Sequence, residues 1–541
     1  SFVIGWTTSI AGSVTIAMLL LGALQYLIPA EYSYTYIPVA ITLIIAFSYV
    51  AFRGMNTSTV MLVSFALITL TAVVAIIVPG FINFQPGNLN PFFVFPSMSI
   101  LLAIFFIAET FFGWESAIFL SAETKDPTKI MPKALIYGTI IIAILSFLLA
   151  FTAMGSIPWS EFSESVAPLK DLGGVHFGAV GGIIFAILIF ISVIGATAGW
   201  IVTAPRLLMS IAEDKLFFTQ FAKIHPKHKS PYISIIFQVL VVSSLVIVGA
   251  GSYETLLHML IPLILVVYSA VLLSVIILRF KRPEIKRPYR VIFGKIGPSI
   301  TIVFMIFLLI MFIKETHGAM DILRISGGLI AFGIPAYFAI ELFYDQKYVT
   351  LRRNLVGVIM HHFHTIGLPK ITFDKILSLV GPFTKKSSIM VFNSSMGTFT
   401  QRIVKGETSF RKIHIANQSK EEIKIFKEKI PAKERKHISI HLLRSLKIPK
   451  KVKNMNVFIS FNDLGNVKDI PLFIKDVKRI LSRKGKFCFY IKNHFLDMTP
   501  NALIVENKDV IVPLFKKEKL IVNYVKKKRF FKTEIFISGR R

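Results

Sequence analysis

One acidic residue stands deep inside an apolar run, where it could take part in binding or in proton transfer. Glu109 follows Ser97 by twelve positions, which is about 18 Å along a helix and near the middle of a lipid bilayer. A lone carboxylate at that depth costs about 2.5 to 3.5 kcal/mol on insertion scales, so it must face a cavity, a partner or a proton. We therefore expect Glu109 to handle a ligand or a proton. The alternative is a protonated glutamate hydrogen-bonded to a neighbouring helix.

The residues after Glu109 predict a break in the same helix. Thr110, Phe111 and Phe112 lead into Gly113, and glycine lowers helix propensity by about 1 kcal/mol relative to alanine. A broken helix inside a membrane exposes N–H groups at one half-helix end and carbonyl groups at the other, and these can bind both charged ends of a zwitterion. A glycine that only serves close helix packing is the alternative.

A tryptophan in a later apolar run is the second candidate. Trp200 follows the small residues Gly195-Ala-Thr-Ala-Gly199, which allow a neighbouring helix to approach closely. A core or interfacial tryptophan is an equally good interpretation.

Membrane helices must position these residues. The chain has 541 residues, of which 54% are apolar and only 17% charged, so it is neither an ordinary soluble domain nor a disordered chain. Its single cysteine, Cys488, excludes a disulfide framework and a cysteine-based metal cluster, and we expect no bound metal or organic cofactor. A membrane span needs about 20 mostly apolar residues. Ten such runs are predicted, at 2–28, 36–52, 58–82, 98–121, 134–156, 178–204, 232–250, 255–278, 298–314 and 324–343.

The basic residues fall in alternate loops between these runs. Sixteen Lys and Arg lie in one set of loops, and the other set holds only Lys170, Lys314 and Arg324. Because basic loops stay in the cytoplasm, residue 1 is predicted on the cytoplasmic side, and ten crossings return the chain there near Asp345. We expect a multi-pass protein of the cell membrane whose C-terminal part is cytoplasmic.

Four motifs follow one another along these runs. They are Arg53-Gly54-Met55-Asn56; Phe111-Phe112-Gly113-Trp114-Glu115 with Glu123-Thr-Lys-Asp-Pro127 and Pro132; Pro205-Arg206-Leu-Leu-Met with Ala212-Glu-Asp-Lys-Leu216 and Ser230-Pro231; and Arg282-Pro-Glu-Ile-Lys-Arg-Pro-Tyr-Arg290. Together they resemble the amino-acid permeases of the amino acid–polyamine–organocation (APC) superfamily. The resemblance covers residues 1 to about 345.

The resemblance implies a secondary amino-acid transporter of the LeuT type, with two inverted five-helix repeats. The chain aligns from the family's third helix, so we expect the first two helices to be absent and the chain as given not to transport. The predicted helix break places the substrate site at Glu109, Thr110, Phe111, Phe112 and Gly113. The resemblance to the family's basic-amino-acid antiporters implies that Trp200 stacks on the aliphatic part of the substrate. A carboxylate at Glu109 would favour a cationic or polyamine-like substrate, and proton or sodium coupling stays open.

Beyond residue 366, short apolar strands alternate with amphipathic stretches, which is the pattern of an α/β domain. This order resembles the class I S-adenosylmethionine-dependent methyltransferase fold, as does a turn at 479–485. Strands are predicted at 388–392, 412–416, 437–442, 457–461 and 486–491, helices after Gly397, from Ser419 to about Lys429 and at 470–481, and a hairpin at 520–525 and 533–538.

The cofactor loop of that fold lacks its expected residues. An acidic residue and closely spaced glycines should follow the first strand, but the chain has Asn393-Ser-Ser-Met-Gly397. Asn417 stands where an acid would bind the ribose hydroxyls. We predict a degenerate domain that keeps the fold without cofactor or enzymatic activity.

The charge of the chain is concentrated in this tail. Beyond residue 350 the chain has 41 Lys and Arg but only 14 Asp and Glu. Anionic lipid headgroups are therefore a candidate partner of the tail. A basic face that is merely solvated is the alternative. No aromatic-rich RNA-binding motif accompanies the basic runs, so no nucleic acid is expected.

We therefore expect three segments. They are a permease domain over 1–345, a linker over 346–366 and a cytoplasmic α/β domain over 367–541. The predicted function is amino-acid transport with a regulatory tail. A membrane-tethered methyltransferase and a nontransporting amino-acid sensor are the alternatives.

Overall fold

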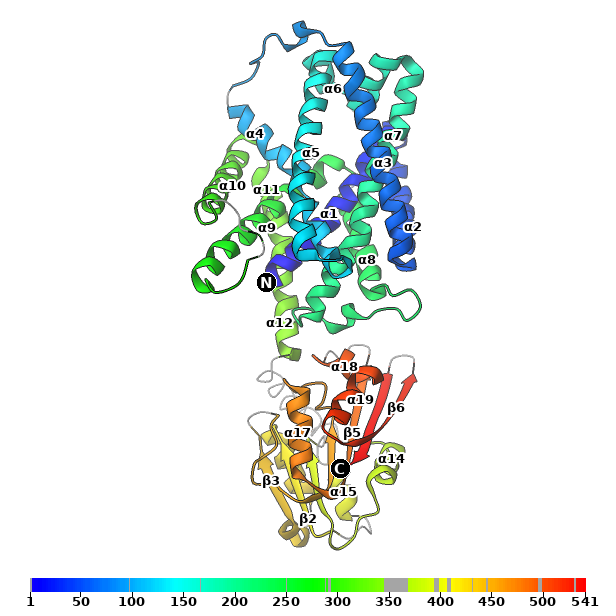
Figure 1. Ribbon diagram of the computed structural model, residues 1–541, viewed down its shortest axis with the longest axis vertical. Helices are drawn as coiled ribbons and strands as arrows, with labels where there is room; N and C mark the ends of the chain where they lie inside the picture. Colours follow the sequence, from blue (N-terminus) through cyan, green and yellow to red (C-terminus); the bar gives the residue numbers. More distant parts are fainter. Residues whose placement is uncertain are drawn as a thin grey trace. The chain divides into compact units, whose positions relative to one another are not determined.

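The computed structural model describes most of the chain, as two compact units (Figure 1). The described residues are 2–96, 98–165, 167–249, 251–287, 289, 293–344, 368–393, 398–405, 410–430, 432–443, 446–494, 499–529 and 532–541. One unit holds Ser1–Phe217 and Phe221–Ala336, and the other holds Phe218–Gln220 and Tyr337–Arg541. The predicted linker over 346–366 lies outside the described residues.

The first unit is a bundle of apolar helices. Among the described residues, eight helices are long and apolar enough to cross a membrane, and the shorter apolar helices Met98–Thr110 and Tyr232–Val248 occupy two further predicted spans. This architecture is that of a multi-pass helical membrane protein. Its helices are α1 (Phe2–Leu27), α2 (Tyr36–Arg53), α3 (Met55–Ile82), α4 (Met98–Ile107), α5 (Pro127–Ser156), α6 (Trp159–Glu164), α7 (Pro168–Glu213), α8 (Tyr232–Val248), α9 (Tyr253–Lys281), α10 (Ile296–Glu315), α11 (Ala319–Ala331) and α12 (Gly333–Tyr344).

Two predicted spans differ from the structure. The run at 98–121 is not one helix, because α4 ends at Ile107 and 3-10 turns follow. The run at 178–204 is the middle of a 46-residue helix, α7, whose backbone departs from helical geometry only at Gly178, with φ +74°. Apolar length alone could not distinguish a broken span from a long helix with a kink.

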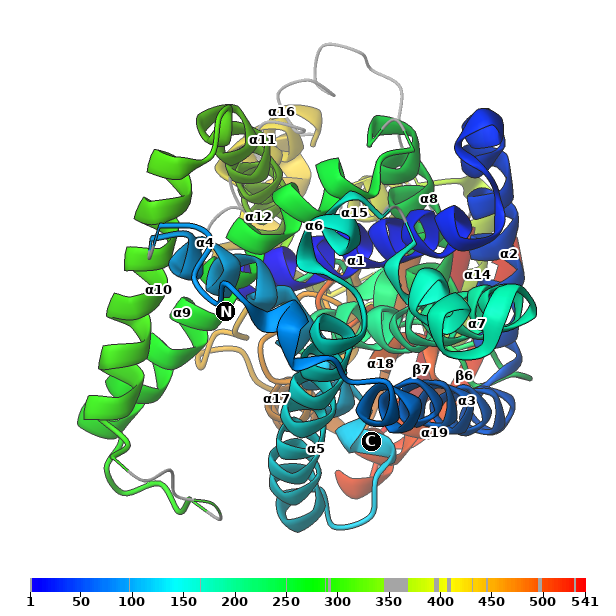
Figure 2. The ribbon, with the colours of Figure 1, turned by 90° about the horizontal axis from the view of Figure 1, so that it is seen from above.

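Helix α1 lies in the interior of the bundle, as the two views agree (Figures 1 and 2). It packs against α7, α8 and α9. Its buried hydroxyls bond their own helix, with Thr7 donating to the carbonyl of Val3 and Ser13 to that of Ser9, both at 2.8 Å. These bonds satisfy polar groups that the apolar interior would otherwise leave without partners.

The second unit is built on a seven-stranded sheet. The spatial order of its strands is β3-β2-β1-β4-β5-β7-β6. Strands β1 to β5 pair in parallel, and β7 pairs antiparallel with both β5 and β6. This is the strand order of the methyltransferase-like fold. The strands are β1 (Ser388–Phe392), β2 (Lys412–Asn417), β3 (Ile438–Leu442), β4 (Met455–Phe461), β5 (Leu481–His494), β6 (Ile521–Arg529) and β7 (Lys532–Arg540).

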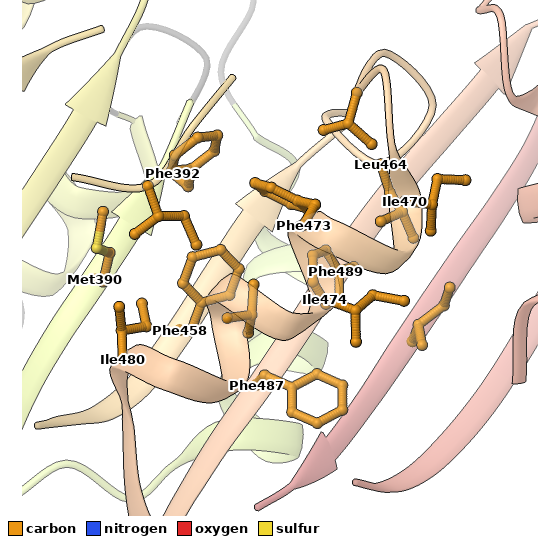
Figure 3. Close-up of a cluster of buried hydrophobic side chains, with 14 of the residues drawn as sticks. Met390, Phe392, Phe458, Leu464, Ile470, Phe473, Ile474, Ile480, Phe487 and Phe489 are labelled. Carbon is orange, nitrogen blue, oxygen red and sulfur yellow. The ribbon is translucent and has the colours of Figure 1, made fainter. Parts of the chain in front are cut away.

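Helices cover both faces of the sheet, each over its own apolar core. On one face, Phe473 and Ile474 of α17 pack on Phe458 and Phe489 (Figure 3). On the other face Ile376 of α14 belongs to a separate core cluster. The helices are α14 (Lys370–Val380), α15 (Thr398–Lys405), α16 (Lys420–Lys429), α17 (Ile470–Ile480), α18 (Ala502–Glu506) and α19 (Lys508–Lys517).

The turn expected at 479–485 interrupts the first residues of β5. Helix α17 runs to Ile480, and β5 begins at once with Leu481, which pairs with Met455 of β4. Leu481 is 1% exposed. The pairing register then shifts, because Val457 of β4 pairs with Lys486. A Cβ on Gly485 would lie only 3.1 Å from the backbone N of Ser482, so the chain turns between Leu481 and Lys486, as the sequence pattern indicated.

Candidate functional site

The helical ladder breaks just after Glu109. A 3-10 helix at Ala108–Phe111 follows α4, Phe112 is extended with φ −83° and ψ 134°, and Gly113 has φ +117°. The N–H of Phe112 donates to the carbonyl of Glu109 at 2.8 Å, and the chain then turns into a second 3-10 helix, Trp114–Glu123. A left-handed φ of this kind favours glycine, so Gly113 permits the break.

Trp200 of α7 packs directly on the broken segment. Its ring stacks on Phe112 with centroids 5.2 Å apart and an interplanar angle of 23°. A Cβ atom on Gly113 would lie 3.2 Å from the indole Nε1. Trp200 is only 6% exposed, so Phe112, Gly113 and Trp200 form one closed contact.

Three further residues, which the sequence did not single out, complete this cluster. A Cβ on Gly12 of α1 would lie 2.7 Å from Cζ3 of Trp200, so only a glycine lets α1 approach this closely. Tyr268 of α9 lies 6.2 Å from the Phe112 ring, and Gln238 of α8 reaches the carbonyl of Trp200 at 3.5 Å. The small residues around Gly12 were a usable signal, whereas nothing in the sequence placed Tyr268 or Gln238.

The other predicted site residues have neighbours of their own, as far as the structure describes them. Thr110 is exposed and lines a cavity of about 580 Å³ together with Ser192 and Gly195 of α7. Glu109 is half-buried and acts electrostatically on Tyr253 of α9, and no hydrogen bond to its carboxylate is found within the described ranges. The backbone of Phe111 lies in the 3-10 helix, and its side chain is outside the described part of the structure.

The broken segment combines chemistry that an intact helix cannot offer. Where a helix is interrupted, some backbone N–H and carbonyl groups are not bonded within a continuous helix. The ends of the two half-helices can then bind charged groups of a ligand. The aromatic rings of Phe112 and Trp200 supply an apolar wall beside them. In membrane carriers such a combination of half-helix ends and aromatic rings is typical of sites for small molecules with two charged ends and an apolar part.

In the second unit, the polar groups at the carboxyl ends of β1, β2 and β4 bond one another. The amide of Asn393 donates to Asp463, and its Oδ1 accepts the N–H of Gln418 at 3.2 Å. The hydroxyl of Ser460 donates to the other carboxylate oxygen of Asp463 at 2.8 Å, and Asp463 is 0% exposed. These groups lie where a class I methyltransferase holds its cofactor.

Asn417, which the sequence pattern placed where an acid would bind the ribose hydroxyls, is also hydrogen-bonded within the domain. Asn417 donates to the Glu422 carboxylate at 2.6 Å, and its Oδ1 accepts the N–H of Ser419 at 2.9 Å. Asn417 is 3% exposed. Its acceptor oxygen and one N–H of its amide are therefore engaged within the domain.

Two histidines on neighbouring strands of this unit share a hydrogen bond. Nδ1 of His414 lies 3.1 Å from Nε2 of His441, and the rings stack with centroids 5.4 Å apart. Burial, then His441 and Lys412, lower the pKa of His414 to about 4. The pKa of His441 is lowered as well, by burial and by Lys412.

The first unit defines a multi-pass helical membrane protein with an interrupted helix. Residues 1–323 match the family described as amino acid permease, and the chain belongs to this family. The APC-superfamily resemblance of the first unit is thereby confirmed.

Several curated transporters are similar to the chain. It is 27% identical to the methylthioribose transporter of Bacillus subtilis (strain 168), over 49% of this chain and 57% of that one. It is 23% identical to the branched-chain amino acid permease BcaP of the same organism (58% and 65%), and 26% identical to Asc-type amino acid transporter 1 of Mus musculus (53% and 52%). The chain thus spans between half and two thirds of the length of these relatives.

Solved methyltransferase structures align with part of the chain. One is an S-adenosylmethionine-dependent methyltransferase from Aquifex aeolicus, with a TM-score of 0.26 and 13% identity, over 31% of this chain and 88% of that one. A likeness at this score carries no weight, so the fold of the second unit rests on its own strand order.

Proposed function

We propose that the protein is a secondary transporter of amino acids that works by alternating access. The observation that carries this proposal is the helix break at Phe112–Gly113, packed on Trp200, in a chain of the amino acid permease family. A break of this kind is the usual means by which such carriers bind a zwitterion near the middle of the bilayer.

In this proposal each site residue has its own role. The backbone around Gly113 binds the carboxylate and the amine of the substrate, and Trp200 and Phe112 stack on its aliphatic part. Helices α4 and α5 rock against α1, α2, α7 and α8. Support comes from the packing of α1 on α7 and α8 and from the contact of α5 with the 3-10 helix after Gly113.

We propose that Glu109 takes up a proton or a second amine of the substrate. Its half-buried carboxylate near the broken segment supports this role, because an intramembrane acid is costly without a function. Proton coupling predicts uptake that a pH gradient drives, and sodium coupling predicts uptake that a sodium gradient drives. Measuring uptake under each gradient therefore identifies the coupling ion. Competition between lysine and leucine shows whether Glu109 favours an added amine.

For the tail, we propose a cytoplasmic regulatory or assembly domain rather than an enzyme. The hydrogen bonds of Asn393 to Asp463 and of Asn417 to Glu422 support this, since they engage polar groups at the strand ends where a cofactor would bind. Calorimetry of the full-length protein with S-adenosylmethionine should show no binding, and micromolar binding would refute the proposal. Anionic lipid headgroups are the partner that the basic surface favours.

Uptake of labelled amino acids into proteoliposomes tests the transport proposal. Full-length protein should give uptake above protein-free vesicles. Binding of an amino acid without uptake would instead identify a sensor, and the transport proposal would then be wrong.

A further inference from the structure

Two histidines join the end of α2 to the loop that follows α7. The rings of His225 and His228 stack with centroids 5.0 Å apart, and both pack on Phe52 in the last turn of α2, at 5.0 and 4.8 Å. The hydroxyl of Ser230 donates to the carbonyl of Phe52 at 2.7 Å. We call Phe52, His225, His228 and Ser230 the histidine clamp.

The backbones of the two segments are also in close contact. Gly54, between α2 and α3, has φ +110°, and a Cβ there would lie 2.8 Å from the carbonyl oxygen of His228. Any residue other than glycine would therefore be strained by its backbone and would clash with the loop. The α2–α3 link and the loop at 225–230 are thus in direct backbone contact, which the glycine at position 54 permits.

One hydrogen bond in the clamp requires a neutral histidine. The backbone N–H of His228 donates to Nδ1 of His225 at 3.2 Å, so Nδ1 must carry a lone pair. An imidazolium has a proton on both ring nitrogens and cannot accept this bond. Protonation of His225 therefore removes one of the contacts that shape the loop.

The positive charges around the clamp disfavour the protonated form of His228. Burial, then His225, Lys227 and Arg53, lower the pKa of His228, against a hydrogen bond to the backbone of Arg53 that raises it. The chargeable groups that act on His228 are thus all basic, from its own loop and from α2. Arg53 donates to the hydroxyl of Tyr49 at 3.3 Å, and from α8 the Tyr232 ring lies 6.0 Å from His225.

We propose that the histidine clamp is a pH-sensitive latch between the α2–α3 link and the α7–α8 loop, closed when both histidines are neutral and released when they are protonated. Protonation removes the acceptor on His225 and places two positive rings 5.0 Å apart beside Arg53 and Lys227. Because α3 begins at this link, release changes how far α3 can move, so the effect on uptake rests on the proposed transport function.

The test combines a distance and an uptake measurement on the full-length protein. Spin labels at Ile45→Cys of α2 and Lys229→Cys of the loop report the separation of the two segments, since both positions are exposed and the native Cys488 is buried. The labelled protein should show a wider distance distribution at pH 5.5 than at pH 7.5. Uptake should change by about threefold or more when the solution on the side of the membrane that carries the histidine clamp is acidified.

Variants separate the latch from other effects of pH. The double variant His225→Gln and His228→Gln keeps a hydrogen-bond acceptor but cannot be protonated, so its distances should be the same at both pH values. Ser230→Ala removes a bond that does not titrate and should loosen the clamp at both. His317→Gln, at an exposed histidine between α10 and α11, is the matched control and should keep the full pH response.

A pH response that survives in the double variant would overturn the latch, as would an unchanged distance in the histidine-containing protein. A distance that responds to pH in a protein without uptake at either pH would support the latch and refute the transport function. The two proposals can therefore fail separately.

Discussion

Replacing Gly113 by alanine tests the broken helix directly. At φ +117° an L residue is strained by about 1 to 2 kcal/mol, and the added Cβ would lie 3.2 Å from Nε1 of Trp200, so the indole must shift by a few tenths of an ångström. The broken conformation should therefore lose about 1 to 3 kcal/mol relative to alternatives. This corresponds to a loss of about 5- to 150-fold in uptake at low substrate concentration.

The assay is initial uptake by full-length protein in proteoliposomes, with the melting temperature of each variant as a check on folding. Gly199→Ala is the matched control, because it makes the same chemical change beside Trp200 in α7. A Cβ on Gly199 meets only Leu62, at 3.8 Å. The control should stay within about twofold of the unmodified protein. Equal uptake by the two variants would refute the role of the break.

Three further predictions concern the candidate site and the tail. Trp200→Ala should raise the half-saturating substrate concentration by about 2- to 10-fold through lost stacking, with Trp200→Phe close to unmodified, and an unaltered value would mean a packing role. Glu109→Gln should weaken uptake or flatten its pH dependence, and an unchanged pH profile would remove Glu109 from the site. In the tail, His414 has a pKa of about 4, so the unfolded chain binds a proton near pH 6.5 that the folded unit does not. The stability of the tail should therefore be full above about pH 6.5, fall between about pH 6.5 and 4, and level off below, by about 1 kcal/mol after allowance for the half-exposed rings. Hydrogen exchange of β2 and β3 measures this, and the same slope in a His414→Gln, His441→Gln variant would contradict it.

Local sequence signals predicted much of the tail. The strand at 388–392 has the predicted bounds, because a continuous apolar run with both faces buried is a strong signal for a parallel strand. Ser419 was predicted to cap a helix, and its hydroxyl accepts the N–H of Glu422 at 3.1 Å. Helix α14 at Lys370–Val380 was missed, although Ile376 and Val380 are buried in the core.

The candidate site was only partly predictable. Gly113 could be recognised as a breaker from its residue type, because conformational freedom is a local property. Its contact with Trp200, and that of Trp200 with Gly12, depend on how α1, α7 and the broken segment pack. No spacing rule joins residues that are 38 or more positions apart, so Tyr268 and Gln238 could not be assigned to the cluster in advance.

The most direct test of the central claim is counterflow in proteoliposomes. Vesicles holding the purified full-length protein are loaded with an unlabelled amino acid, and entry of the same labelled amino acid is followed. We predict a transient accumulation above protein-free vesicles for at least one of the twenty amino acids, and its loss in Gly113→Ala. Counts equal to those of protein-free vesicles for every amino acid would contradict the account.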